Sequence, residues 1–254
     1  MTARRISEVA VGILLIALVL ALWQGIVASG IAPPVLLPAP GAVFARLIEQ
    51  AGNRAFLENA AITLYRLFAG FSIAVIVGVT LGLASTGSEA VEGVVKPLVR
   101  VLAPLPKVAL HPAMILTLGF DDASKIALVA ADAVFPILLA TWQGTSAVEP
   151  KLVWSARAAG TSPRAALFKV VLMAALPSVL TGCRIALIIS CIVVFLAEMI
   201  TASDGLGHLL VRAARNFQTV DMFVPLITIS LLGLILNALL GAVRSYLLRG
   251  FPET

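Results

Sequence analysis

Six long apolar stretches constrain the fold of this chain more than any other feature of its sequence. They extend over residues 8–28, 60–84, 97–119, 124–143, 176–200 and 222–247. A helix needs about 20 apolar residues to cross the hydrocarbon core of a membrane, and each stretch provides that length. Only 12% of the residues are charged, about half the share in a soluble domain. The sequence therefore predicts an all-α polytopic membrane protein with six transmembrane helices.

The distribution of basic residues predicts the orientation of these helices. The first stretch follows Arg4 and Arg5 and resembles a signal peptide, but its apolar run is longer than the 7–15 residues or so of a signal peptide, so we expect it to be retained. Lys and Arg favour the predicted inner segments, which are both termini, 85–96 and 144–175. This bias places both termini in the cytoplasm. The net charge of +5 is spread along the chain and does not indicate nucleic-acid binding.

Two outer segments predict short helices at the membrane surface. After Pro40, the apolar residues Val43, Phe44 and Leu47 recur at helical spacing, which is typical of an amphipathic helix lying on a membrane. The second segment opens with Ser203 or Asp204, either of which is a plausible helix cap.

Small residues in the second and fifth stretches indicate close packing. Gly70, Gly78 and Gly82 form a stripe that allows another helix to approach closely, and we expect this stripe to offer a face to a second copy of the chain. Cys183 and Cys191 lie about 12 Å apart along one helix, too far for a disulfide, so we interpret both as packing residues.

The longest inner segment has the pattern of a helical hairpin. Pro150 stands where a helix can start and Gly160 where it can stop. Ser162 is a predicted cap for a second helix, with Pro163 at its first position, and this helix continues into the fifth apolar stretch. A hairpin projecting from the membrane is suited to docking into the groove of a partner protein. The alternative is a solvated connecting loop.

The sequence WSARAAGTSPRAALFKVVLMAALPSVLTG, residues 154–182, resembles the cytoplasmic Glu-Ala-Ala loop of ABC-importer permeases. The continuation VVLMAALPSVLTGCR is similar to the branch of that family that imports taurine, alkanesulfonates and nitrate. Further similarity covers TLYRLFAGF, LGFDDASKIAL and AEMITASDGLG, so the resemblance extends over most of the chain.

The resemblance assigns roles to single positions of this loop. Trp154, Ser155 and Ala156 stand at the Glu-Ala-Ala positions, Gly160 at the family's glycine and Pro177 in its closing Leu-Pro. The residues implied to couple the membrane domain to an ATPase are Trp154, Ser155, Ala156, Arg157, Gly160 and Pro177. Trp154 replaces the family's acidic residue, so a salt bridge made by that glutamate is absent here. Met173 replaces a proline found in many relatives.

The resemblance implies a type I ABC-importer permease with a MetI-like bundle, multi-pass in the bacterial inner membrane. Residues 1–57 would hold the first transmembrane helix and the periplasmic amphipathic segment, and residues 58–254 the core, with a cytoplasmic coupling loop at about 144–175. The implied partners are a cytoplasmic ATPase dimer, a second permease copy in a homodimer, a periplasmic solute-binding protein and membrane lipid. The implied solute is a small anion such as a sulfonate, nitrate or an organic acid.

Four polar residues in or beside the apolar stretches are candidates for the pathway or its gate. Asp132 is expected to line a cavity or to pair with a basic residue, because a buried carboxylate needs a partner. Glu198 either shapes an outer gate or a contact between copies, or simply reaches the lipid headgroups. Arg184 either extends to the cytoplasmic surface or faces the pathway, where it would attract an anion.

His111 is the fourth candidate. It lies among Pro104, Pro106 and Pro112, which are expected to break the third stretch and free backbone groups to line a cavity. The alternative is a packing residue whose hydrogen bonds are satisfied. His208 is remote in sequence, and no carboxylate accompanies either histidine at ligand spacing, so we assign no metal site.

Two other classes of function compete with a permease. An autonomous ion-coupled carrier often shows inverted repeats, and an intramembrane enzyme needs a nucleophile–base pair or a metal constellation; neither pattern is visible in the sequence. The chain also lacks a G-x-x-x-x-G-K-[ST] loop for ATP phosphates, so we expect a separate subunit to hydrolyse ATP, and we assign the chain no enzymatic activity and no cofactor. A permease for an exporter is a further alternative.

Overall fold

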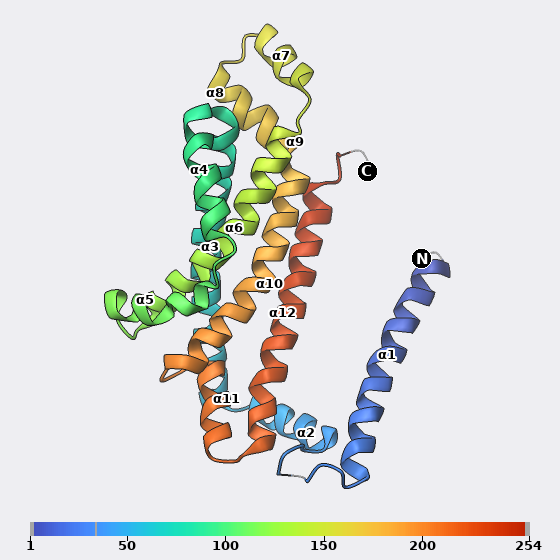
Figure 1. The fold of residues 1–254 in the computed structure, drawn as a ribbon. Helices are drawn as coiled ribbons and strands as arrows, with labels where there is room; N and C mark the ends of the chain where they lie inside the picture. Colours follow the sequence, from blue (N-terminus) through green and yellow to red (C-terminus); the bar gives the residue numbers. More distant parts are fainter. Residues whose placement is uncertain (1–2, 34, 252–254) are drawn as a thin grey trace.

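The computed structural model describes residues 3–33 and 35–251, and within these ranges every regular element is a helix (Figure 1). Five helices are long and apolar enough to cross a membrane. They are α1 (Ala3–Ala28), α3 (Arg54–Gly87), α6 (Asp122–Ser146), α10 (Leu176–Thr201) and α12 (Thr219–Leu247). These correspond to five of the six predicted apolar stretches and confirm the all-α membrane fold.

The remaining stretch, the third, over 97–119, is not one continuous helix, and the predicted break at its prolines is confirmed. The chain forms α4 (Glu89–Leu102), the short helix η1 (Lys107–Leu110) and α5 (His111–Leu118), and the two parts are bent by 89°. Proline cannot continue a helix because it lacks an amide hydrogen and its ring clashes with the preceding turn. Pro104 and Pro106 lie in the break and account for it. The chain has six crossings only if this bent pair counts as one.

The glycine stripe of α3 packs against α6 of the same chain. A side chain added at Gly70 would lie 2.7 Å from Cβ of Val129, and one at Gly78 would lie 2.9 Å from Cβ of Ile137. These separations are too short for any residue larger than glycine, so the expected close helix approach is confirmed. The further expectation that the stripe receives a second copy is wrong, because α6 already occupies it.

Helix α10 is the centre of the bundle. It contacts α3, α6, α11 (Leu206–Arg215) and α12. Of the residues in its apolar segment 61% are buried, compared with 6% for the corresponding segment of α12 and none for that of α1. Helix α1 stands apart from the bundle (Figure 1). It is held near its C-terminal end by Trp23, whose Nε1 donates to the carbonyl of Pro38 at 3.0 Å and whose ring lies 5.4 Å from that of Phe223.

The two ends of the bundle carry different short helices. At one end, α7 (Pro150–Ala158) and α8 (Pro163–Ala166) form a projecting hairpin, and α8 continues through the π-helix η2 (Leu167–Val171) and α9 (Leu172–Ala174) into α10. At the opposite end lie α2 (Pro40–Ala51) and α11, while α12 ends on the hairpin side (Figure 1). Arg46 of α2 is paired with Asp221 at the start of α12, with Nε and Oδ1 2.6 Å apart.

Candidate functional site

The hairpin at the end of the bundle has the local structure that its sequence predicts. Pro150 occupies the first turn of α7, where no amide hydrogen is needed. Gly160 has φ +86°, and its N–H donates to the carbonyl of Arg157 while that of Thr161 donates to Ala156, both at 3.0 Å. This pair of bonds closes the helix and requires a left-handed residue, which glycine adopts without strain. Ser162 then accepts from the amide of Ala165 at 3.4 Å and caps α8.

Helix α7 buries none of its side chains within the chain. Trp154 is 66% exposed and Leu152 is 48% exposed, so an aromatic and an aliphatic side chain lie on a helix that projects from the bundle. Ser155 and Arg157 are exposed as well, and Ala156 is half-buried. Pro177 lies in the first turn of α10, beyond the π-helix. The predicted coupling residues therefore lie on α7 and its turn, or at the start of the helix into which the hairpin continues.

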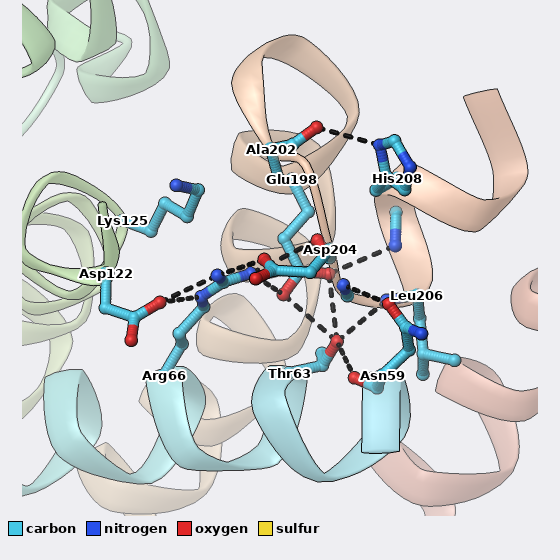
Figure 2. A network of polar contacts seen from close by, with 12 residues as sticks. Asn59, Thr63, Arg66, Asp122, Lys125, Glu198, Ala202, Asp204, Leu206 and His208 are labelled. Atoms are coloured by element: carbon cyan, nitrogen blue, oxygen red, sulfur yellow. Dashed lines mark hydrogen bonds and ion pairs between the residues drawn. The ribbon is translucent and has the colours of Figure 1, made fainter. Parts of the chain in front are cut away.

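A buried ion cluster lies toward the other end of the bundle, around Arg66 of α3. The Arg66 side chain is 2% exposed and faces three carboxylates (Figure 2). Its Nη1 is 2.9 Å from Oε1 of Glu198 at the end of α10, its Nε is 2.7 Å from Oδ1 of Asp122 at the start of α6, and its Nη2 pairs with Asp204 before α11. One guanidinium thus joins three segments that are distant in sequence.

The cluster continues through hydrogen bonds to Glu198 (Figure 2). Its Oε2 accepts from Thr63 Oγ1 at 2.9 Å and from the amide of Gly207 at 3.0 Å. Thr63 Oγ1 also accepts from the amide of Leu206 at 2.9 Å, and Asn59 Oδ1 accepts from the amide of Gly205 at 2.7 Å. Every one of these buried acceptors has a donor, which is the condition for burying charged groups.

The cluster corrects two expectations about the outer segment. Glu198 is 1% exposed, so the alternative that it reaches the headgroups is wrong. Neither Ser203 nor Asp204 caps α11, whose N-cap is Gly205 with φ +92° and no side-chain cap; the Asp204 carboxylate is drawn to Arg66 instead. A side chain at Gly205 would collide with the Glu198 carboxylate. Arg66 was not among the predicted site residues, although an arginine inside an apolar stretch is a signal for such a site.

Asp132 and His111 lie near the broken span. Asp132 is paired with Lys107, with Oδ1 and Nζ 3.5 Å apart, so of its two expected roles, lining a cavity or pairing with a basic residue, the structure shows the second. Lys107 Nζ also donates to the carbonyl of Ala103 at 2.7 Å, across the proline break. His111 is fully buried, and neither ring nitrogen has a hydrogen-bond partner among the described residues. It is therefore not the satisfied packing residue of the alternative prediction.

Arg184 is exposed on α10, and its Nε donates to Oδ1 of Asn237 on α12 at 2.8 Å. Asn237 stands at one end of a groove of about 480 Å³ between the two helices, whose other lining residues are mostly apolar. This bond holds the guanidinium against the neighbouring helix, and both expectations for Arg184, extension to the cytoplasmic surface and facing the pathway, stay predictions.

The chain belongs to the family described as "binding-protein-dependent transport system inner membrane component", whose model matches residues 74–251. It is a permease subunit of the ABC-transporter class, and this assignment is favoured over the autonomous carrier.

Relatives of this family are similar along nearly the whole chain. A protein of Bacillus subtilis (strain 168) named as an aliphatic sulfonates transport permease, SsuC, is 30% identical over 94% of this chain and 86% of its own length. The taurine transport system permease protein TauC of Escherichia coli (strain K12) is 28% identical over 93% of this chain and 88% of its own length. The fold is similar to a chain of the inward-facing MetNI methionine ABC transporter, with TM-score 0.63 and 18% identity over 78% of this chain and 97% of that one.

Removing Arg66 should destabilise the bundle strongly. In Arg66→Ala the carboxylate of Glu198 stays buried without its cation, and we expect a loss of about 3–5 kcal/mol in the free energy of unfolding. Unfolding by titration with sodium dodecyl sulfate from mild-detergent micelles measures it. Arg66→Lys should be intermediate, because a lysine keeps the charge but cannot hold three carboxylates with a planar fork.

The matched control is Arg54→Ala on the same helix. Arg54 pairs with Glu58 at 2.9 Å, but its side chain is 93% exposed, and water screens such a pair, so we expect unfolding to be unchanged. Equal unfolding of Arg66→Ala and Arg54→Ala would show that the cluster does not hold the bundle together.

Proposed function

We propose that this chain forms half of the membrane pathway of an ABC importer for small organic or inorganic anions, such as sulfonates, nitrate or organic acids. The projecting hairpin carries the proposal, because Trp154 and Leu152 are exposed on a helix that buries no side chain within the chain, and aromatic residues are enriched at protein contacts. SsuC is named for aliphatic sulfonates and TauC for taurine, which supports a sulfonate as the solute. A periplasmic binding protein would deliver it to the end that carries α2 and α11.

The hairpin is suited to receive the movement of an ATPase dimer and pass it to α10. Helix α7 contacts η2, and a side chain at Gly87 of α3 would lie 2.9 Å from Cδ2 of Leu167 of η2, so the π-helix lies between the hairpin and the end of α3. From there the chain enters α10, which is about 39 Å long at a rise of about 1.5 Å per residue. Trp154 would fill the ATPase groove in place of the family's acidic contact, and Gly160 would hold the turn.

At its far end α10 carries Glu198 into the Arg66 cluster. A shift of α10 along its axis would therefore pull on α3, α6 and the segment before α11 together. We propose that this cluster is part of the outer gate. Asp132 and His111, next to the bent third span, are proposed to line the pathway, because irregular backbone at membrane depth occurs where it faces protein or a water-filled cavity.

Two substitutions test the coupling role of the hairpin. Trp154→Ala should weaken ATPase association about thirtyfold, since truncating a buried aromatic anchor costs about 2 kcal/mol or more. Gly160→Val should act through the backbone alone, because nothing lies within 4 Å of an added side chain and a branched residue at positive φ costs about 1–2 kcal/mol. Both should leave the permease inserted in the membrane while co-purification of the ATPase falls and uptake is lost.

Ala158→Ser, on the exposed surface of the same helix, is the control and should change neither ATPase association nor uptake. If Trp154→Ala retains full association and full uptake, Trp154 is not the anchor, and its replacement of the acidic residue has no consequence for coupling.

The orientation of the bundle yields a second test. We propose that the hairpin and both termini are cytoplasmic and that α2 is periplasmic, as the bias of Lys and Arg indicates. Gly41 of α2 and Ser155 of α7 are exposed positions at opposite ends. With both native cysteines replaced by alanine, a membrane-impermeant maleimide should label Gly41→Cys in intact cells and Ser155→Cys only after permeabilisation. The reverse pattern would contradict the topology.

A second permease chain is proposed to complete the pathway. Helices α1 and α12 are almost entirely unburied within one chain, so their apolar surfaces are available to a second chain. Native mass measurement of the purified transporter should show two permease chains, either two copies or one copy with a close homologue. A complex that contains one permease chain and still imports solute would contradict this.

A further inference from the structure

The pair formed by Arg184 and Asn237 lies at membrane depth. Arg184 is about 12 Å along α10 from Leu176, and Asn237 is about 15 Å from Leu247 at the end of α12, at a rise of about 1.5 Å per residue. The hydrocarbon core is about 30 Å thick, so neither residue stands at the helix end where a charge reaches water freely. Charged side chains at such depth almost always face a bundle interior or a water-filled cavity.

The guanidinium is held in place by the neighbouring helix. Side chains on a helix point toward its N-terminus, and the Nε of Arg184 bonds across to Asn237 on α12 at 2.8 Å. Because arginine only donates hydrogen bonds, the atom of Asn237 that faces it must be the carbonyl oxygen. The side-chain NH2 of Asn237 and the two Nη groups of Arg184 are the further donors of this pair.

The surface around this pair is apolar. On α10, Ile188 is 47% exposed and Ile192 is 55% exposed, and on α12 Leu234 is 65% exposed. These residues line the groove of about 480 Å³ that ends at Asn237. Pockets of this size accept small organic ligands, whose orientation is fixed by a few polar groups. The site therefore offers donors and a cation for an anionic head next to apolar walls for an alkyl chain.

We propose that Arg184 and Asn237 form an anion-binding station of the pathway, at which a sulfonate or carboxylate head contacts the guanidinium and the alkyl part lies in the α10–α12 groove. Planar guanidinium groups bind such oxyanions with two parallel hydrogen bonds. The proposal rests on the proposed function as an importer. It makes this pair the determinant of solute charge, separate from the hairpin that couples the chain to ATP hydrolysis.

The charge of the groove is tested by thiol chemistry in membranes that contain the complete transporter. Cys183 and Cys191 are replaced by alanine, and Leu234→Cys, one turn from Asn237, reports the local potential. The probes are an anionic reagent, 2-sulfonatoethyl methanethiosulfonate, and a cationic one, 2-(trimethylammonium)ethyl methanethiosulfonate. We expect the anionic reagent to be favoured, and Arg184→Gln to lower the ratio of the two rates at least about tenfold, since a unit charge at this range acts on both reagents with opposite sign.

Arg184→Lys should keep most of the ratio, and the control Arg244→Gln, which removes a charge nearer the end of α12, should leave it unchanged. If neither charged reagent reacts in the nucleotide-free or the ATP-bound state while lipid-soluble N-ethylmaleimide does, the groove faces lipid or a dry contact and the proposal is overturned. It is also overturned if the ratio does not respond to Arg184→Gln.

Uptake separates this proposal from the proposed function. Uptake is measured in proteoliposomes that contain the permease with its native cysteines, its ATPase and its binding protein. Compared with the wild type, Arg184→Gln should lower uptake of taurine or butanesulfonate at least about tenfold while stimulation of ATP hydrolysis by the binding protein persists. Loss of both uptake and ATPase stimulation would indicate a structural role and overturn the station. A wild-type transporter that moves neither anion, nor nitrate or an organic acid, would overturn the proposed function itself, whatever the thiol rates show.

Discussion

The guanidinium of Arg66 is enclosed by carboxylates from the start of α6, the end of α10 and the segment before α11. Burying a single arginine is unfavourable, and three acidic partners in good geometry offset that cost. The positions of these partners then fix the adjoining ends of α6, α10 and α11 relative to α3. Gly205 and Gly207 follow from the same requirement, because side chains at either position would collide with or crowd Glu198. The end of the bundle opposite the hairpin is thus organised around one charge.

The half of the bundle nearer the hairpin is organised differently. There Gly78 and Gly82 of α3 lie against Ile137 and Thr141 of α6 by close packing, and the hairpin is defined by caps and turns. The packed helices are held because little space separates them, and the hairpin is held because its helix ends have hydrogen-bond partners. In the proposed mechanism, a motion received at the hairpin passes through these elements to the polar cluster at the other end of α10.

The parts of this structure that the sequence predicted are those set by local signals. The apolar stretches, the start of α7 at Pro150 and the turn at Gly160 depend on residues a few positions apart, and each is found where it was expected. The ion cluster depends on residues more than 50 positions apart, and no local pattern pairs them. For this reason Asp204 was mistaken for a helix cap and Glu198 was left with a headgroup alternative. The bend after Leu102 was signalled by prolines, but its angle of 89° depends on packing.

The π-helix η2 between the hairpin and α10 has a consequence for the angular register of the chain. A π turn contains one residue more than an α turn, and each residue of an α-helix rotates the following chain by about 100°. The extra residue in Leu167–Val171 therefore determines the azimuth at which α7 presents Trp154 relative to the face of α10 that bears Arg184. Deleting a single residue there would remove none of the hairpin residues that could contact a partner. It would nevertheless turn the hairpin by more than a quarter of a circle relative to α10, away from any partner that binds its present face.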